Sequence, residues 1–111
     1  MKQFNAAHLE VKKEFTEDFQ THPFECGWAD EAIFYVMVEG VSGEGATLEG
    51  VVELSHDGVN WTAEGTTVGP LTEKGLNFVR VSHFGNWLRL NCKVSGDEPV
   101  FKLLIQIALK G

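Results

Sequence analysis

Apolar and polar residues alternate with a period of two along much of the chain after residue 31. The clearest case is residues 101–109, where every second residue is a large apolar one and Lys102 and Gln106 lie between them. Successive side chains of a strand point to opposite faces, so this pattern predicts a strand with one face in a core. Residues 47–55 alternate in the same way and predict a second half-buried strand.

Residues 32–38 are apolar at almost every position rather than at every second one. Such a run is typical of a central strand, or of a strand whose second face lies in a contact with another molecule. Ile33, Tyr35 and Met37 fall on one side of this strand. We predict these three residues to be interface residues.

Turn-forming residues separate the apolar stretches. Asp57-Gly58 is the strongest hairpin signal, because Gly tolerates positive φ and Asp caps the turn. It is followed by a short returning strand at 60–63. Strands are also expected at 78–83 and 87–94. Further turns or loops are predicted at 40–45, 66–75, 84–86 and 95–99.

The N-terminal part has a less decided pattern. Leu9, Val11 and Phe15 fit a strand, whereas the spacing of apolar residues over 4–19 fits a helix about as well. We favour a strand, because the rest of the chain is β and needs a partner. The sequence therefore predicts an all-β fold with one domain over residues 1–111. We expect a single antiparallel β-sandwich, jelly-roll or Greek-key-like, with its core in 32–110 and a segment of uncertain structure in 1–31.

Two predicted hairpins resemble each other. Residues 52–61 read V-x-x-S-H-x-G-x-N-W, and residues 79–87 read V-x-x-S-H-x-G-N-W. The repetition indicates either an old duplication or two hairpins that solve one turn problem with the same residues. Both interpretations agree with a sandwich of short strands joined by tight turns.

Composition and charge narrow the classes of partner. The chain has 111 residues, 43% of them hydrophobic, which is enough for one core. Its net charge of −7 argues against nucleic acid or an anionic membrane as a partner, because both require a basic face. No run of about 18 apolar residues is present. The first residues lack the apolar stretch of a secretory signal, so we expect a cytoplasmic location or an already processed form.

The charges are unevenly distributed. Residues 1–64 hold 13 acids and 3 bases, which gives −10, and residues 65–111 hold 3 acids and 6 bases, which gives +3. Either the two halves attract each other within one molecule, or they form complementary faces for neighbouring copies. We favour the first interpretation, since charged faces are commonly solvated.

Candidate chemistry is sparse, and we expect the protein not to be an enzyme. Ser55-His56-Asp57 has the residue types of a catalytic triad, but neighbours on a strand point to opposite faces and cannot hydrogen-bond in the required order. The histidines form no HxH or HxxxH pair. His56 and His83 precede matching turns and would meet only if both turns lie at one edge. We therefore predict no catalytic residues, no metal site and no cofactor.

Two cysteines and two tryptophans remain to be explained. Cys26 and Cys92 each lie on the apolar side of a local alternation, which favours buried free thiols over a disulfide. Trp61 and Trp87 follow the two similar turns. They either pack across one end of the sandwich or form a platform on which a sugar ring stacks, so a carbohydrate stays possible as a partner.

The order of motifs over residues 38–110 resembles small β-sandwich proteins encoded among the virion structural genes of tailed bacteriophages. The motifs are a Gly-rich turn into Thr47-Leu48, the S-x-D-G-x-N-W hairpin at 55–61, the W-x-R strand at 87–89 and the G-x-x-P piece at 96–99. The hairpin alone also resembles discoidin-type carbohydrate-binding sandwiches.

The phage resemblance implies a building block without catalytic residues or cofactor. Such a protein would act through self-association or by docking on other structural proteins, as a head or tail accessory component of a virion. The alternative that the second resemblance implies is a carbohydrate- or surface-binding module.

Overall fold

The computed structural model describes residues 4–111, which form seven strands and no helix. No helix in this part of the chain is therefore long and apolar enough to cross a membrane. The strands are β1 (Phe4–Phe15), β2 (Phe19–Gln20), β3 (Phe24–Glu25), β4 (Glu31–Ser55), β5 (Thr62–Leu71), β6 (Gly75–Ser82) and β7 (Trp87–Lys110). All of their pairings are antiparallel.

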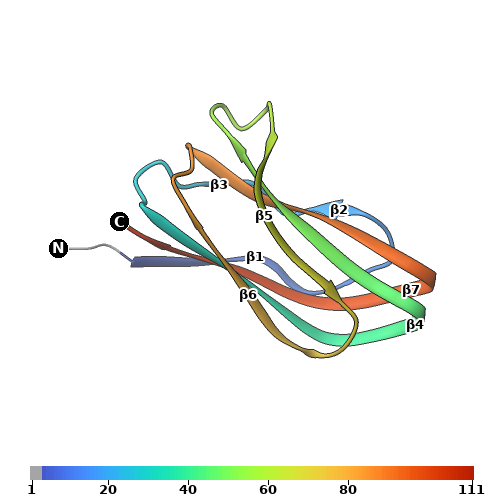
Figure 1. Cartoon of the computed structure of the whole chain (residues 1–111). Coiled ribbons are helices and arrows are strands. Elements are labelled where there is room, and N and C mark those ends of the chain that lie inside the picture. Colours follow the sequence, from blue (N-terminus) through green and yellow to red (C-terminus); the bar gives the residue numbers. More distant parts are fainter. Residues whose placement is uncertain (1–3) are drawn as a thin grey trace.

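The long strands β4 and β7 pair along their whole length, from Glu31 opposite Lys110 to Ser55 opposite Trp87. Both bend at a shared corner, at the right of Figure 1, so each strand contributes to two layers. The first layer has the order β1, β7, β4, β6, and the second has β2 and β3, β7, β4, β5. With β2 and β3 taken as one interrupted strand, this is the order of a jelly roll. The predicted all-β sandwich is confirmed.

The core lies between the two layers and is built from the residues that the period of two indicated. Phe101, Leu103, Ile105, Ile107 and Leu109 are all fully buried, as predicted for the last strand. The even-numbered residues of 32–38 are also buried, and the buried apolar side chains of both layers form one cluster. The prediction that Cys26 and Cys92 lie on apolar faces is confirmed, because both side chains are buried and neither forms a disulfide.

The predicted turns at 40–45 and 95–99 are wrong. Both segments are parts of β4 and β7 and remain paired, with Ser42 opposite Val100 and Thr47 opposite Ser95. Register shifts between these pairs absorb extra residues, and such bulges bend strands from one sheet to another. Gly43 has a φ of 104°, and a Cβ there would lie 2.7 Å from the carbonyl oxygen of Glu98. The glycines therefore form a corner within paired strands.

Two other connections differ from the sequence-based prediction. Residues 66–71, predicted as a loop, belong to β5, because Val68 is buried opposite Gly50 while register shifts accommodate the extra residues. The turn at 84–86 does not close a hairpin. It joins β6, which among the described strands pairs with β4 alone, to the second-layer part of β7.

The N-terminal segment is a strand rather than a helix, since Phe4–Phe15 pairs with β7. This pairing places β7, from the basic half of the chain, between β1 and β4 of the acidic half. Glu53 and Arg89 form an ion pair at 2.7 Å across β4 and β7. Four positions along the same strand pair, Glu49 lies opposite Lys93 and again matches opposite charges. This arrangement favours attraction of the two halves within one molecule.

The corner yields a test with a matched control. Gly45 also has positive φ, but a Cβ there meets nothing within 4 Å. We expect Gly45→Ala to lower the free energy of unfolding by about 1–2 kcal/mol, the cost of a left-handed residue. Gly43→Ala should cost roughly 3 kcal/mol or more, because the backbone must also move. Urea denaturation measures both values, and equal losses would contradict the role of Gly43 at the corner.

Candidate functional site

The three predicted interface residues lie together on the outer face of the first layer. Tyr35 pairs with Phe78 of β6 on one side and with Gln106 of β7 on the other. Met37 lies between Leu76 and Leu104 in the same way. Cross-strand partners share a face, so these residues form one apolar surface. We call it the outer patch, and it comprises Ile33, Tyr35, Met37, Leu76, Phe78 and Leu104.

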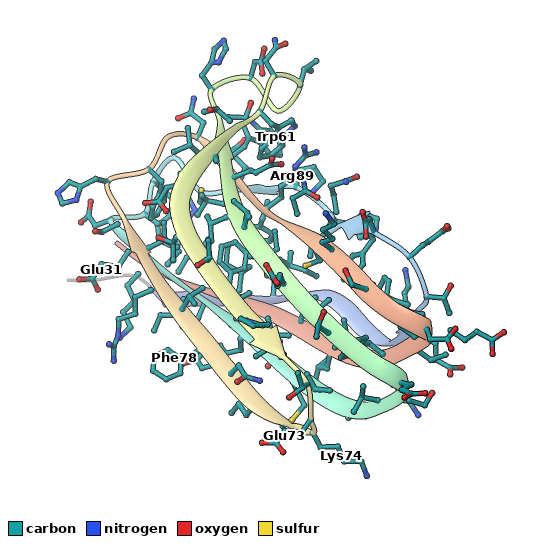
Figure 2. The ribbon with its side chains drawn as sticks, turned by 45° about the vertical axis from the view of Figure 1, so that its right-hand side comes forward. Glu31, Trp61, Glu73, Lys74, Phe78 and Arg89 are labelled. Atoms are coloured by element: carbon teal, nitrogen blue, oxygen red, sulfur yellow. The ribbon has the colours of Figure 1, made fainter. Side chains whose placement is uncertain are left out.

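Exposure within the outer patch rises towards its edge. The β4 members are half-buried, whereas Leu76 is 58% and Phe78 51% exposed. Figure 2 shows the Phe78 ring pointing away from the body of the protein. The aromatic rings of Tyr35 and Phe78 lie 6.4 Å apart, and the guanidinium of Arg80 lies 5.1 Å from the Phe78 ring. Large contiguous apolar surfaces are common at contact sites, so the outer patch is the candidate interface of this chain.

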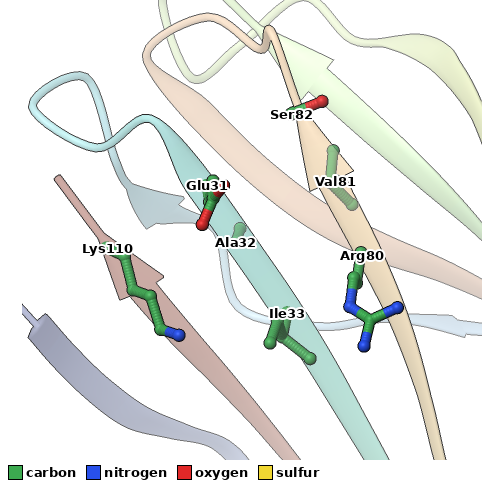
Figure 3. Close-up of a pocket in the computed structure, with 7 residues that line it drawn as sticks. All are labelled: Glu31, Ala32, Ile33, Arg80, Val81, Ser82 and Lys110. Carbon is green, nitrogen blue, oxygen red and sulfur yellow. The ribbon is translucent and has the colours of Figure 1, made fainter.

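A shallow pocket of about 270 Å³ lies at one end of the outer patch. Figure 3 shows Ile33 between the long side chains of Lys110 and Arg80, with Glu31 beside them. Ser82 adds a hydroxyl to the rim. The pocket is therefore mixed in charge and continuous with the apolar surface.

The Ser55-His56-Asp57 string forms a turn. The Ser55 hydroxyl donates to Asp57 Oδ1 at 2.9 Å and accepts the N–H of Gly58 at 2.9 Å. Asp57 Oδ1 also accepts the N–H groups of Asn60 and Val59, which hold the pKa of this carboxyl well below its usual range. The His56 side chain is 82% exposed and lies beside Asp57, not beside the Ser55 hydroxyl. The interpretation of this string as turn chemistry agrees with these contacts.

Three loops meet at this end of the sandwich. Asn86 Nδ2 donates to the carbonyl of His56 at 3.3 Å, and the carbonyl of Asn86 accepts the N–H of Cys26 at 2.7 Å. The two similar turns therefore pack against each other, although only one closes a hairpin. His83 has a φ of 59° and an exposed side chain. In the described part of the chain, no three His, Cys, Asp or Glu side chains are grouped so that they could hold a metal.

Trp61 and Trp87 both lie at this end of the second layer. The guanidinium of Arg89 lies 4.3 Å from the Trp61 ring. Figure 2 shows the two side chains next to each other. Trp87 packs against the turn, where a Cβ on Gly58 would lie 3.2 Å from its ring. The protein itself thus contacts both rings. Their role in stacking on a sugar stays a prediction.

A row of polar side chains crosses the outer face of the second layer beside Trp61. Gln20 Nε2 donates to Asn91 Oδ1 at 3.1 Å. Asn91 Nδ2 donates to Glu53 Oε2 at 3.3 Å, and Glu53 Oε1 accepts from Arg89 Nε. We call these four residues the polar row. They come from three different strands, so only the folded pairing of β2, β7 and β4 brings them together.

The sequence-based prediction missed Leu76, Phe78 and the polar row. Leu76 and Phe78 precede Arg80 with a period of two, which is a signal for one strand face. That face is recognisable as a surface only once β6 is placed at the edge of the first layer. The polar row carries no sequence signal, because its members are separated by up to 71 positions.

The two thiols lie far apart. The N–H of Cys26 bonds to the carbonyl of Asn86, so Cys26 lies beside residue 86. Cys92 follows Asn86 by six residues and pairs with Phe19 in the second layer. An extended strand spans roughly 20 Å over six residues, which no disulfide bridges. Burial raises the pKa of the Cys26 thiol to about 12, and the negative charge of Glu25 contributes to the rise as a smaller cause.

Comparison with known structures finds the same fold in proteins of very different sequence. The SPBc2 prophage-derived protein YomS matches with a TM-score of 0.67 at 9% identity, over 100% of this chain and 96% of YomS. The PBSX exported protein XepA matches with a TM-score of 0.59 at 10% identity, over 98% of this chain but 36% of XepA.

A chain of the T13 IBDV viral particle also matches, with a TM-score of 0.62 at 14% identity, over 98% of this chain and 31% of that chain. At these identities the likeness shows the fold. This chain spans about a third of the length of XepA and of the IBDV chain. No protein-family model matches the sequence. No curated protein matches it either.

The turn at Ser55 has a matched control in the similar turn. Ser55 is 2% exposed, and Ser55→Ala removes the acceptor of the part-buried N–H groups of Gly58 and Asp57. We expect a loss of about 1–3 kcal/mol in the free energy of unfolding. Ser82→Ala, at the equivalent but exposed position, should change it by less than about 0.5 kcal/mol. Urea denaturation compares the two variants, and a Ser82→Ala loss as large as that of Ser55→Ala would refute the assignment.

The raised pKa of Cys26 predicts an unreactive thiol. At pH 8 a thiol with a pKa of about 12 is thiolate in roughly one molecule in ten thousand. We expect iodoacetamide to modify Cys26 of the folded protein at least a hundredfold more slowly than in urea, as measured by mass spectrometry of the peptide. Equal rates would show that this thiol is ionised or accessible in the folded state.

Proposed function

We propose that this chain is a non-enzymatic structural protein, a head or tail accessory component of a phage particle. It acts by self-association or by docking on a larger assembly, and it resides in the virion. The observation that carries the proposal is the outer patch, a contiguous apolar surface on a protein of net charge −7. A surface of this kind is costly to leave in water and is typical of a contact with another protein.

The fold supports the proposal. Jelly rolls occur in viral capsid domains, and the same fold is present in a prophage-derived protein and in a chain of a viral particle. Ile33, Tyr35 and Met37 take the role of interface residues here. Their side chains face away from the core, so packing of the core does not explain why they are apolar. A contact with another molecule would explain it.

A second candidate function is carbohydrate binding, and the polar row beside Trp61 favours it. Amide, carboxylate and guanidinium groups next to an indole ring are able to hydrogen-bond sugar hydroxyls while the ring packs on a sugar face. Arg89 retains N–H groups beyond the one that bonds Glu53. This surface lies on the other layer of the sandwich, so the two functions are separable by mutation.

Sedimentation velocity over a concentration series tests the assembly role. We expect the wild-type protein to associate, and Met37→Lys to raise the concentration required at least tenfold, because a lysine inside the outer patch must be desolvated. Trp61→Ala should leave association unchanged.

A glycan array and a tryptophan-fluorescence titration test the alternative. Sugar-dependent quenching that is lost in a folded Trp61→Ala, together with a protein that stays monomeric, would replace the assembly role with carbohydrate binding.

A further inference from the structure

The sandwich has four sheet edges in its described part, and three of them are protected against pairing. β1 carries two register shifts against β7, and β5 carries two against β4 together with Pro70, which has no N–H. β2 and β3 are only two residues long. Bulges, prolines and short strands are the usual means by which proteins prevent edge-to-edge pairing.

β6 is the exception. Its eight residues pair with β4 without a register shift, from Glu31 opposite Ser82 to Val38 opposite Gly75. It contains no proline, and none of the described strands pairs with its other side. Every second residue of such a strand directs its N–H and C=O groups towards the free edge, where another strand can bind them.

The side chains of β6 favour an added strand as well. Leu76 and Phe78 are among the most exposed large apolar residues of the described chain, at 58% and 51%. They are exposed because no strand lies beside them on the outer side. A strand added there would flank both side chains, as β4 already flanks them with Met37 and Tyr35.

The distribution of charge favours a second copy of this chain as the molecule that binds at β6. Two copies of a protein with net charge −7 repel each other, and contact costs least where carboxylates are absent. The outward residues of β6 before its last position are Leu76, Phe78 and Arg80, so this face of the strand carries no acid. The surface is thus suited to meeting another copy of itself.

We propose that β6 is the self-association edge: a second copy of this chain pairs its own β6 with it in antiparallel orientation. The first layers of the two copies then form one continuous sheet across a two-fold axis, and the two outer patches merge into one surface. This inference rests on the proposed assembly role and specifies the partner and the contact.

The backbone specifies the register. Paired side chains of the two β6 strands lie on the same face of the sheet only if the two-fold axis passes beside one residue and its own copy. Phe78 and Val79 are the two residues at the middle of β6, so each is a possible position of the axis. An axis beside Val79 would pair Gly75 with His83, whose φ of 59° is not extended. An axis beside Phe78 pairs residues 75–81 with one another, leaves Ser82 facing Lys74 just before the strand, and keeps His83 out of the contact. It also places the exposed Phe78 opposite Phe78 of the second copy. The geometry therefore points to Phe78 as the centre of the contact.

Sedimentation velocity of the full chain provides the first test. We expect a monomer–dimer equilibrium whose dissociation constant rises at least tenfold in Phe78→Lys, because the symmetric contact would bring two lysines together. Val59→Lys is the matched control. Val59 is an exposed apolar residue, 76% accessible, in the loop after β4, and its substitution should leave the constant unchanged.

Amide hydrogen exchange separates edge pairing from stacking of the two apolar faces. Edge pairing adds hydrogen bonds to alternate N–H groups of β6, so their exchange should slow at least tenfold above the dissociation constant. Cysteine cross-linking tests the register, since the native thiols are buried. Phe78→Cys should give an oxidised dimer. Leu76→Cys should not, because it faces position 80 of the second copy and lies too far from its own counterpart.

The outcomes are distinct. Concentration-dependent protection of β6 together with the Phe78→Cys cross-link supports the inference. A dimer that Met37→Lys weakens but whose β6 amides gain no protection would overturn it and leave the proposed function standing. A protein that stays monomeric at every concentration would overturn the inference and the self-association arm of the proposed function, and only docking on a different protein would then remain.

Discussion

The antiparallel pairing of β4 with β7 fixes where the other strands of the sandwich lie. These two strands, of 25 and 24 residues, run side by side through both layers and hold the central positions of each. A pair of strands this long cannot stay flat over one small core. The register shifts near Ser42 and Thr47 bend both strands together, so the alternating apolar residues of each half face the same interior. The sandwich is thus one hydrogen-bonded sheet that is folded over on itself.

The shorter strands take the places that this pair leaves open. β1 and β6 complete the first layer on either side, and β2, β3 and β5 complete the second. The outer surface of each layer is then defined by which short strand flanks β4 and β7. On the first layer, β6 brings Leu76 and Phe78 beside Met37 and Tyr35. On the second layer, β2 brings Gln20 to Asn91, and the ion pair of Glu53 with Arg89 forms across the central strands. One fold therefore presents an apolar surface and a polar surface on its two outer sides.

Several features were predictable because they depend on neighbours in the sequence. The buried face of residues 101–109, the turn around Asp57-Gly58 and the burial of both thiols follow from alternation and from local hydrogen bonding. The assignments that failed concern glycine-rich segments. A glycine with positive φ occurs in a turn and in a bulge alike, and at Gly43 only the partner strand decides between them, because the close carbonyl belongs to Glu98. The hairpin predicted at 84–86 was wrong for the same reason, because a connection between layers and a hairpin use similar turn residues.

The order of residues alone was enough to predict an all-β protein, a core made by every second residue of the long strands, and a shared apolar strand face for Ile33, Tyr35 and Met37. These properties depend on the period of two, which is local. The pairing of distant segments in the folded chain decides which strands are neighbours, which face of residues 32–38 enters the core, and which edge is left regular and unpaired. The exposure of Phe78 and the assembly of the polar row depend on that choice, because contacts between residues far apart in the chain leave no local trace in the order of amino acids.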